Sequence, residues 1–331
     1  MGQTKLKFNR DEVRLFSGRS NPALAAGIAE HLDVPLEDTK VSRFSNDNLF
    51  VQLGASVRGR IVYIVQSLVP PVSDNLMELL MMLDIAQSAS AREVHAIIPY
   101  FSYARSDKKD APRISITARL VADLLKTAGA THVMTMQLHS PQVHGFFALP
   151  TDPLTARGLF GQYFRPQNLS PEEVVVVAPD VGGAKSANRF AQMLGLPAAA
   201  GNKSRLSDSE VHIGGLIGRQ VKGFKHALIF DDEIATGGTV VELCRLLIDL
   251  GIEKLTIICT HGLFLGKATE RLGRIPQINE IVTTDTVPHP TERFLPNMRI
   301  LSTASIFGGA ISQNYHRRSI GDLFDFGAQD D

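Results

Sequence analysis

Short apolar runs alternate with amphipathic segments along most of this chain, and this alternation limits the fold more than any other feature. The runs are rich in Val and Ile and almost free of polar residues, which is typical of strands that are buried on both faces. Apolar residues at the spacing i, i+3, i+4, i+7 predict helices over 76–88 and 239–250. We therefore predict strands over 61–67, 93–101, 131–138, 173–179, 226–232 and 254–262.

The order strand, helix, strand predicts an α/β fold with mainly parallel sheets, because parallel neighbours need a crossover connection. A chain of 331 residues is long enough for two domains. The elements over 61–101 are repeated in kind over 226–262, which indicates two similar halves from a duplication. The alternative is that all such units resemble one another. The proline-containing stretch near 150–160 predicts a boundary between residues 1–157 and 158–331.

Charge and composition exclude several classes of protein. Lys plus Arg and Asp plus Glu each total 34, so the chain lacks the basic excess of a general nucleic-acid or membrane-surface protein. No apolar run approaches the roughly 18 residues of a membrane span, and the polar start is not a signal peptide. Cys244 and Cys259 lie in apolar segments and are expected to be buried thiols in a reducing compartment. The sequence therefore predicts a cytoplasmic protein that acts on neither nucleic acid nor membranes.

The stretch FDDEIATGGT joins a pair of carboxylates to a glycine-rich turn. Gly237 and Gly238 would let successive N–H groups point at one anion, and the start of the following helix adds partial positive charge. Asp231 and Asp232, slightly further back, suit the hydroxyls of a sugar. A phosphorylated sugar satisfies both ends of the motif. The alternative is an acidic strand end that is followed by a glycine-rich helix cap.

A second strand end, APDVGGAK, resembles the first in its chemistry. Asp180 offers a carboxylate that suits Mg²⁺, and the turn at Gly182 and Gly183 suits a diphosphate. An ordinary strand-to-helix turn with a capping Asp would look the same.

Two cationic segments follow other predicted elements. The stretch 101–113 carries Arg105 and Lys108 among four cations, which favours a clamp for a nucleotide triphosphate over a solvated charged loop. The polar segment 202–210 holds Lys203 and Arg205, which would suit a cationic lid over a transferring phosphoryl group. This segment could equally be a plain polar loop. His139, after the strand at 131–138, could bind a nucleotide or a metal.

These motifs, in this order, resemble those of the ribose-phosphate pyrophosphokinases over nearly the whole chain. The resemblance implies two phosphoribosyltransferase-type domains, each a mainly parallel sheet flanked by helices, with the last segment packing back on the N-terminal domain. It further implies Mg²⁺-dependent transfer of the β,γ-diphosphate of ATP to O1 of ribose 5-phosphate, by a homo-oligomer that is usually a hexamer built from dimers. The segments that carry it are SVRG (56–59), DNLMELL (74–80), IPYFSYARSDKKD (98–110), GFF (145–147), APDVGGAK (178–185), the Lys203-x-Arg205 pair, DDEIATGGT (231–239) and THGLF (260–264).

The same resemblance assigns roles to single residues. The ribose 5-phosphate ligands would be Asp231, Asp232, Thr236, Gly237, Gly238 and Thr239. The ATP ligands would be Arg105, Asp107, Lys108, Asp110 and His139, with Phe44 and Asn46 lent by a neighbouring subunit. His139 and Asp180 would serve the metal, Gly182 and Gly183 the diphosphate, and Lys203 and Arg205 the transition state.

Several residues depart from the family pattern. Ala235, Gln137 and Asn48 stand where an acidic residue is usual, Ser106 replaces Gln and Ser115 replaces Pro. These departures keep two alternatives open. One is a catalytically silent subunit that regulates a true synthetase, although such a protein would have no need of the Lys-x-Arg pair. The other is a phosphoribosyltransferase, which the ATP loop argues against. Departures at Ala55 and Gly321 lie near the family's regulatory anion site and put phosphate activation in doubt.

Overall fold

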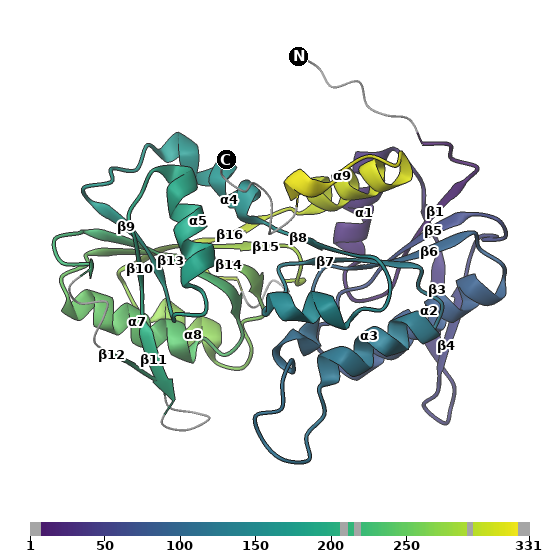
Figure 1. The fold of residues 1–331 in the computed structure, drawn as a ribbon, viewed down its shortest axis with the longest axis horizontal. Helices are drawn as coiled ribbons and strands as arrows, with labels where there is room; N and C mark the ends of the chain where they lie inside the picture. The colour runs from purple at the N-terminus through teal and green to yellow at the C-terminus, as the bar shows by residue number, and fades with distance from the viewer. Residues whose placement is uncertain (1–7, 206–210, 215–219, 290–293, 324–331) are drawn as a thin grey trace. The chain divides into compact units, whose positions relative to one another are not determined.

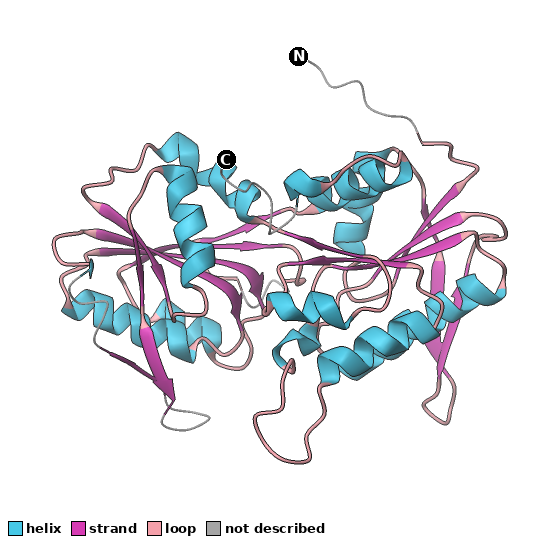
Figure 2. Ribbon diagram, viewed as in Figure 1, coloured by secondary structure: helices cyan, strands magenta, loops and turns pink. Residues whose placement is uncertain are grey.

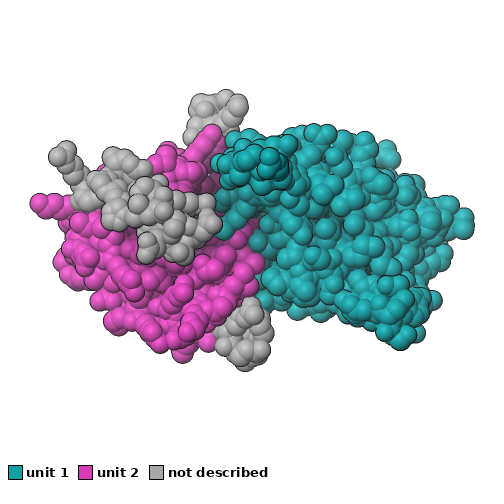
Figure 3. All heavy atoms as spheres, turned by 90° about the horizontal axis from the view of Figure 1, so that it is seen from below, with its two compact units in different colours: residues 1–155, 286–288, 302–331 teal, residues 156–285, 289–301 magenta. Residues whose placement is uncertain are grey.

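The computed structural model describes residues 8–205, 211–214, 220–289 and 294–323 (Figure 1). For β11, β12 and Asp322 its description covers the backbone alone. The chain forms two compact units, which Figure 3 colours separately. The first holds the described residues up to Thr155, Thr286–Pro288 and those from Ser302 onward; the second holds Ala156–Asp285 and His289–Leu301.

The first unit is built on a six-stranded parallel sheet with the order β2-β1-β5-β6-β7-β8. Helices cover both of its faces (Figure 2). One core cluster joins β5 and β6 to the buried sides of α2 and α3 through residues such as Ile64, Leu83 and Val121. The strands are β1 (Val13–Ser17), β2 (Leu36–Glu37), β5 (Ile61–Val65), β6 (Glu93–Ile98), β7 (His132–Met136) and β8 (Thr151–Leu154); the helices are α1 (Pro22–Leu32), α2 (Val72–Ser88), α3 (Thr117–Thr127) and α9 (Ala304–Tyr315).

The second unit repeats this plan with the order β10-β9-β13-β14-β15-β16, again all parallel. Its core cluster joins the central strands to α7 through residues such as Ile229, Leu243 and Ile257. The strands are β9 (Val174–Ala178), β10 (Ala198–Ala200), β13 (His226–Ile234), β14 (Lys254–Gly262), β15 (Ile278–Thr284) and β16 (Met298–Leu301); the helices are α4 (Arg157–Phe164), α5 (Ala184–Leu194), α7 (Gly238–Asp249) and α8 (Ala268–Gly273).

Two antiparallel pairs lie outside these sheets. β3 (Thr39–Arg43) pairs with β4 (Leu49–Leu53), and β11 (Asn202–Arg205) pairs with β12 (Val211–Gly214). Short 3₁₀ helices complete the described elements: η1 (Ser102–Arg105), η2 (Pro141–Phe146), η3 (Arg165–Gln167) and η5 (Gly321–Leu323).

The predicted α/β class, the six predicted strands and both predicted helices are confirmed, with differences at their ends. β6 stops before Pro99, which has no N–H to continue the ladder. β7 stops before Gln137, whose φ of 42° leaves the extended region. The apolar runs therefore mark the strands well; four of the six runs extend past the carboxyl end of their strand, whereas β14 ends as predicted and β13 continues two residues further.

The strands that the sequence aligned with one another occupy equivalent places. β5 and β6 are third and fourth in the first sheet, and β13 and β14 are third and fourth in the second. The shared strand order is what a duplication predicts.

Both cysteines are free and buried, as expected. Among the described residues, no helix is both long and apolar enough to cross a bilayer.

Candidate active site

The glycine-rich turn of the second unit has the backbone of an anion site. Gly237 lies at φ 73° and ψ 0°, in the left-handed region that glycine enters at least cost, and α7 begins at Gly238. The N–H groups in the first turn of a helix have no acceptor inside that helix. Together with the partial charge of the helix, they favour an anion bound there. Thr236 is exposed beside this turn, and Thr239 lies in the first turn itself.

A neighbouring segment holds the turn in place. The N–H groups of Leu263 and Phe264 donate to the Ile234 carbonyl at 2.9 and 3.2 Å, and the N–H of Leu265 donates to the Ala235 carbonyl at 2.8 Å. This explains why THGLF accompanies DDEIATGGT in the motif set. The backbone of Ala235 is thus fixed whichever side chain stands there.

Asp231 and Asp232 lie on β13 itself, which runs two residues further than expected. The N–H of Asp232 donates to Asp231 Oδ1 at 2.9 Å. Burial raises the pKa of Asp231 well above its usual value, and the negative charges of Asp232 and then Asp180 raise it further. The structure therefore brings three of the predicted carboxylates together. Such a cluster is relieved by hydroxyl donors or by a cation.

The turn after β9 places Asp180 at the end of the neighbouring strand. Its Oδ1 accepts a hydrogen bond from the N–H of Gly183 at 3.0 Å, so the carboxylate shapes the turn that leads into α5. A Cβ added at Gly182 would lie 3.1 Å from the same oxygen, which favours glycine there. The turn is thus capped by Asp180, as the alternative interpretation expected, and the N–H of Gly183 is occupied by this hydrogen bond.

Within the described ranges, no group of three or more His, Cys, Asp or Glu side chains has the arrangement of a metal site. Mg²⁺ rarely needs one, since it keeps several waters and takes one or two carboxylates plus substrate phosphates. The carboxylates of Asp180 and its neighbours fit that donor set. His139, the other predicted metal residue, is exposed after β7 in the first unit, whereas Asp180 belongs to the second.

The predicted ATP loop follows β6 in the first unit. Arg105 ends η1, and Asp107, Lys108 and Asp110 lie in the irregular segment beyond it. Arg105, Lys108 and Asp110 are exposed, as residues that meet a ligand must be. Ser106 closes the base of this loop: its hydroxyl donates to the Ser115 carbonyl at 3.3 Å and accepts from the N–H of Thr117 at 3.3 Å.

Phe44 and Asn46 lie at the tip of the β3–β4 hairpin. The Phe44 side chain is 58% exposed, although its ring touches Phe50 edge-on at 5.7 Å between centroids. Asn46 Oδ1 accepts from the N–H of Asn48 at 3.3 Å. A large exposed aromatic side chain at a hairpin tip suits contact with a flat ligand or a second protein surface.

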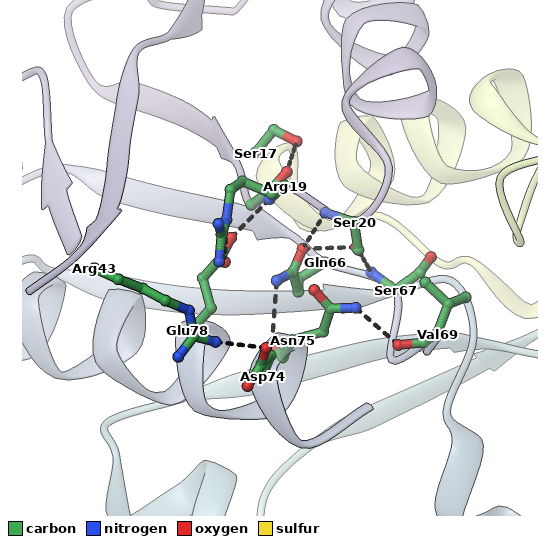
Figure 4. Close-up of polar contacts among 11 residues, drawn as sticks. Ser17, Arg19, Ser20, Arg43, Gln66, Ser67, Val69, Asp74, Asn75 and Glu78 are labelled. Carbon is green, nitrogen blue, oxygen red and sulfur yellow. Dashed lines mark hydrogen bonds and ion pairs between the residues drawn. The ribbon is translucent and has the colours of Figure 1, made fainter. Parts of the chain in front are cut away.

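Sequence reasoning missed Arg43, which anchors that tip. Its guanidinium donates to the Asp47 carbonyl and carboxylate, both at 2.8 Å. It also donates to Asp74 Oδ2 on α2 at 2.6 Å (Figure 4). An Arg that bridges two carboxylates is a common structural device. Nothing in the sequence pairs Arg43 with a residue 31 positions away.

Gln137 replaces a usual Asp directly before the His139 segment. It is buried, its N–H donates to the Leu154 carbonyl at 2.8 Å, and its Oε1 accepts from the Thr155 hydroxyl at 3.2 Å. An amide oxygen therefore accepts this hydrogen bond without adding a negative charge.

Lys203 and Arg205 lie on β11, where they pair in register with Ile213 and Val211 of β12. The predicted polar loop is thus partly a two-stranded hairpin. The side chains of both cations lie outside the described part of the structure.

A buried polar network explains the DNLMELL segment. Glu78 is fully buried and accepts from the backbone N–H of Arg19 at 2.6 Å and from its Nε at 2.8 Å. Gln66 Oε1 accepts from the hydroxyl and the N–H of Ser20 at 2.6 and 3.1 Å, and its amide donates to the Asn75 carbonyl at 3.2 Å (Figure 4). These bonds fix the loops after β1 and β5 to α2, at the edge of the sheet where ligands bind.

Comparison with known proteins fits this arrangement. A model described as the N-terminal domain of ribose phosphate pyrophosphokinase matches residues 13–129, and one described as the phosphoribosyl synthetase-associated domain matches residues 215–325. A curated protein of Streptomyces coelicolor is 48% identical over 314 residues, which are 95% of this chain and 98% of the relative. The ribose-phosphate pyrophosphokinase of Caldanaerobacter subterraneus subsp. tengcongensis is 43% identical over the same shares of both chains. The chain belongs to the ribose-phosphate pyrophosphokinase family.

A solved structure agrees with the sequence matches. The phosphoribosylpyrophosphate synthetase of Mycobacterium smegmatis is 36% identical, with a TM-score of 0.85 over 92% of this chain and 99% of that one. Both units thus have the phosphoribosyltransferase-type fold of this family, as predicted.

Proposed function

We propose that this protein transfers the β,γ-diphosphate of ATP to O1 of ribose 5-phosphate and so forms 5-phosphoribosyl 1-diphosphate and AMP. One observation carries the proposal: a carboxylate pair near the carboxyl end of β13 is followed, a few residues on, by a left-handed glycine turn. This segment offers acceptors for a sugar diol and donors for a phosphate. Full-length similarity to ribose-phosphate pyrophosphokinases supports the choice of sugar phosphate and donor.

Each predicted residue has a role in this reaction. Thr236, Gly237, Gly238 and Thr239 hold the 5-phosphate, while Asp231 and Asp232 accept hydrogen bonds from the ribose hydroxyls. Arg105, Asp107, Lys108, Asp110 and His139 hold ATP, and the hairpin tip with Phe44 and Asn46 packs on the adenine of a neighbouring subunit. Gly182 and Gly183 bind the diphosphate, and Lys203 and Arg205 stabilise the charge of the transition state.

Mg²⁺ is the proposed cofactor. Asp180 and His139 would hold it together with phosphate oxygens, and when bound it would neutralise charge on the transferring group. Phosphoryl transfer leaves little covalent work for the protein, so alignment and cationic groups supply most of the catalysis. We also propose a homo-oligomer, built from dimers, that works in the cytoplasm, which fits the buried free thiols.

The test is a product assay with purified protein, ATP, ribose 5-phosphate and Mg²⁺. We expect AMP and 5-phosphoribosyl 1-diphosphate in equal amounts. The absence of both, across divalent metals and phosphate concentrations, would refute the proposal.

Lys203→Ala tests the assigned catalytic pair. We expect kcat to fall by orders of magnitude, since a single donor to a developing charge contributes about 2.7–4 kcal/mol. Binding of ATP, measured by calorimetry, should change little. If ATP binding is lost while the fold is intact, Lys203 is a binding residue and its catalytic role is wrong.

The silent regulatory subunit is the second candidate, and the uncharged Gln137 and Ala235 favour it. It predicts no product from the pure protein but a changed rate when an active synthetase is added. The two assays together separate the candidates.

A further inference from the structure

A polar cavity lies in the first unit, at the amino ends of β5, β6, β7 and β8. This is the edge opposite to the ATP loop, which follows the carboxyl end of β6. The cavity measures about 870 Å³, and residues near the end of α9 complete its wall. The reaction proposed above uses none of its side chains.

Four of these side chains form a continuous row of polar contacts across neighbouring strands. Glu93 Oε2 lies 3.2 Å from His95 Nε2, His95 Nδ1 lies 3.0 Å from His132 Nδ1, and His132 Nε2 lies 2.8 Å from Asp152 Oδ2. The histidines are only 2% and 6% exposed. Strand register sets the contact, because His95 and His132 are direct partners in the β6–β7 pair.

Counting protons shows that the two histidines in this row of four side chains cannot both be neutral. A ring nitrogen that faces a carboxylate must carry a hydrogen, so both Nε2 atoms are protonated. A neutral imidazole then has a lone pair on Nδ1, and two lone pairs would face each other at 3.0 Å. A hydrogen bond at that place needs a third proton, which makes one of the two rings an imidazolium.

The surroundings show which groups carry the charges. The hydrogen bond from His95 lowers the pKa of Glu93, so this carboxylate is ionised. Burial lowers the pKa of His95, whereas His132 Nε2 lies 2.8 Å from Asp152 Oδ2, so the geometry favours His132 as the place for the positive charge. Tyr63 stacks on His95 at 4.5 Å, and burial raises its pKa, so it is neutral.

We propose that Glu93, His95, His132 and Asp152 form a binding site for one proton, held as an imidazolium at neutral pH, and that this proton sets the net charge of the cavity. The other charged groups that face the cavity are Glu12 before β1, Arg92 before β6, and Arg317 and Arg318 after α9; Tyr315 is uncharged. Its three carboxylates and three guanidiniums cancel, so the bound proton makes the cavity positive and its loss makes the cavity neutral.

Linkage gives the sign of the effect on stability. Histidines in an unfolded chain release their proton near pH 6.5. The folded chain keeps one proton above that pH, so stability falls as pH rises further. While the folded state holds the proton, the unfolding equilibrium constant should rise up to tenfold per pH unit.

Glu93→Gln tests the proposal, because a glutamine amide can donate to His95 Nε2. All hydrogen bonds of the row can then form while the rings of His95 and His132 are both neutral. Glu93 is half-exposed, so the fold should tolerate the change. Glu12→Gln is the matched control: it removes the same charge from the same cavity, where Glu12 accepts from the Tyr315 hydroxyl at 3.3 Å and the Asn9 amide at 3.2 Å and pairs with Arg92, but does not contact either histidine.

Denaturant unfolding from pH 6.5 to 8.5 is the measurement. The unfolding free energy of wild type and of Glu12→Gln should fall with rising pH. For Glu93→Gln the slope of this fall should be smaller by the amount that corresponds to one bound proton. Equal slopes for all three proteins would overturn the proposal. Neutron diffraction at pH 7 checks it without a variant: three deuterons on the four ring nitrogens of His95 and His132 support the site, and two refute it.

Discussion

At the residue scale, the carboxylate of Asp231, which is proposed to bind the ribose hydroxyls, lowers the stability of the folded protein. Its pKa is raised because it is buried beside Asp232 and Asp180, so its ionisation in the folded chain is costly. When the pKa of a carboxyl is higher in the folded protein than its unfolded value of about 3.9, the folded protein loses stability as the pH rises from the unfolded to the folded pKa. Active sites commonly retain such strain.

We expect Asp231→Asn to be more stable than wild type at pH 7 and to lose ribose 5-phosphate binding. The stability gain should vanish near pH 3, about one unit below the unfolded pKa of about 3.9, where wild-type Asp231 is mostly protonated in both states. Thermal unfolding at both pH values and calorimetry with ribose 5-phosphate measure the two effects. Asp84→Asn, at an exposed position on α2, is the control. A destabilised Asp231→Asn would contradict the electrostatic argument.

Ser106, one of the departures from the family pattern, ties the base of the predicted ATP loop. Its hydroxyl makes two hydrogen bonds, to the Ser115 carbonyl and from the N–H of Thr117. Both partners are backbone groups, and a proline at 115 would offer the same carbonyl, so the tie depends on the serine at 106 and not on the residue at 115.

Ser106→Ala should therefore raise the KM for ATP several-fold, because the loop loses a tie of about 0.5–1.5 kcal/mol per hydrogen bond. The KM for ribose 5-phosphate should stay unchanged. Steady-state kinetics with each substrate varied is the measurement. Ser88→Ala, which removes a hydroxyl bond to Ile85 within α2, controls for general effects of losing a serine. An unchanged KM for ATP would show that the tie does not order the loop.

At the scale of the element, the β3–β4 hairpin depends on one side chain for its orientation. Arg43 joins the hairpin tip to α2 through Asp47 and Asp74. These contacts are exposed, so each adds little to the stability of the fold, but together they set the orientation of the tip that carries Phe44, and losing all of them should free it.

We expect Arg43→Gln to raise the KM for ATP about tenfold and to change kcat much less. The reason is positional, since Arg43 orients the tip and needs no contact with ATP. Arg119→Gln is the matched control, because its ion pair with Asp123 is an exposed pair within one helix and contributes little. A fall in kcat with no change in KM would refute this role for Arg43.

Elements were easier to predict than the contacts between them. The buried strands and amphipathic helices could be predicted, because burial on both faces leaves a continuous apolar run and burial of one helix face leaves a helical period in the sequence. Edge strands such as β2 and β16 are short and less regular in pattern, and no prediction included them. The glycine turns were found by composition, whereas the Gln66–Ser20 and Arg43–Asp74 contacts join residues far apart in the chain.

At the scale of the whole molecule, the two units carry different proposed ligands. Ribose 5-phosphate belongs to the second unit and ATP largely to the first. A ligand that binds only the folded state stabilises it by about 2.7 kcal/mol at 100 times its Kd.

Hydrogen exchange with each ligand alone should show this division. Ribose 5-phosphate should protect amides over 226–241, and a non-hydrolysable ATP analogue should protect 101–117, each with a smaller effect on the other segment. Ribose itself, without the phosphate, is the control and should protect neither. Equal protection of both segments by either ligand would contradict a division of ligands between units.

The common strand order of the two sheets bears on how this enzyme evolved. The duplication proposed from the sequence would have left each copy with a complete sheet and its own edge of loops, so that neither fold depended on what those loops bound. One copy could keep a glycine turn for a sugar phosphate while the other acquired a cationic loop and a hairpin. Selection could then act on the loops of one half without endangering the core of either.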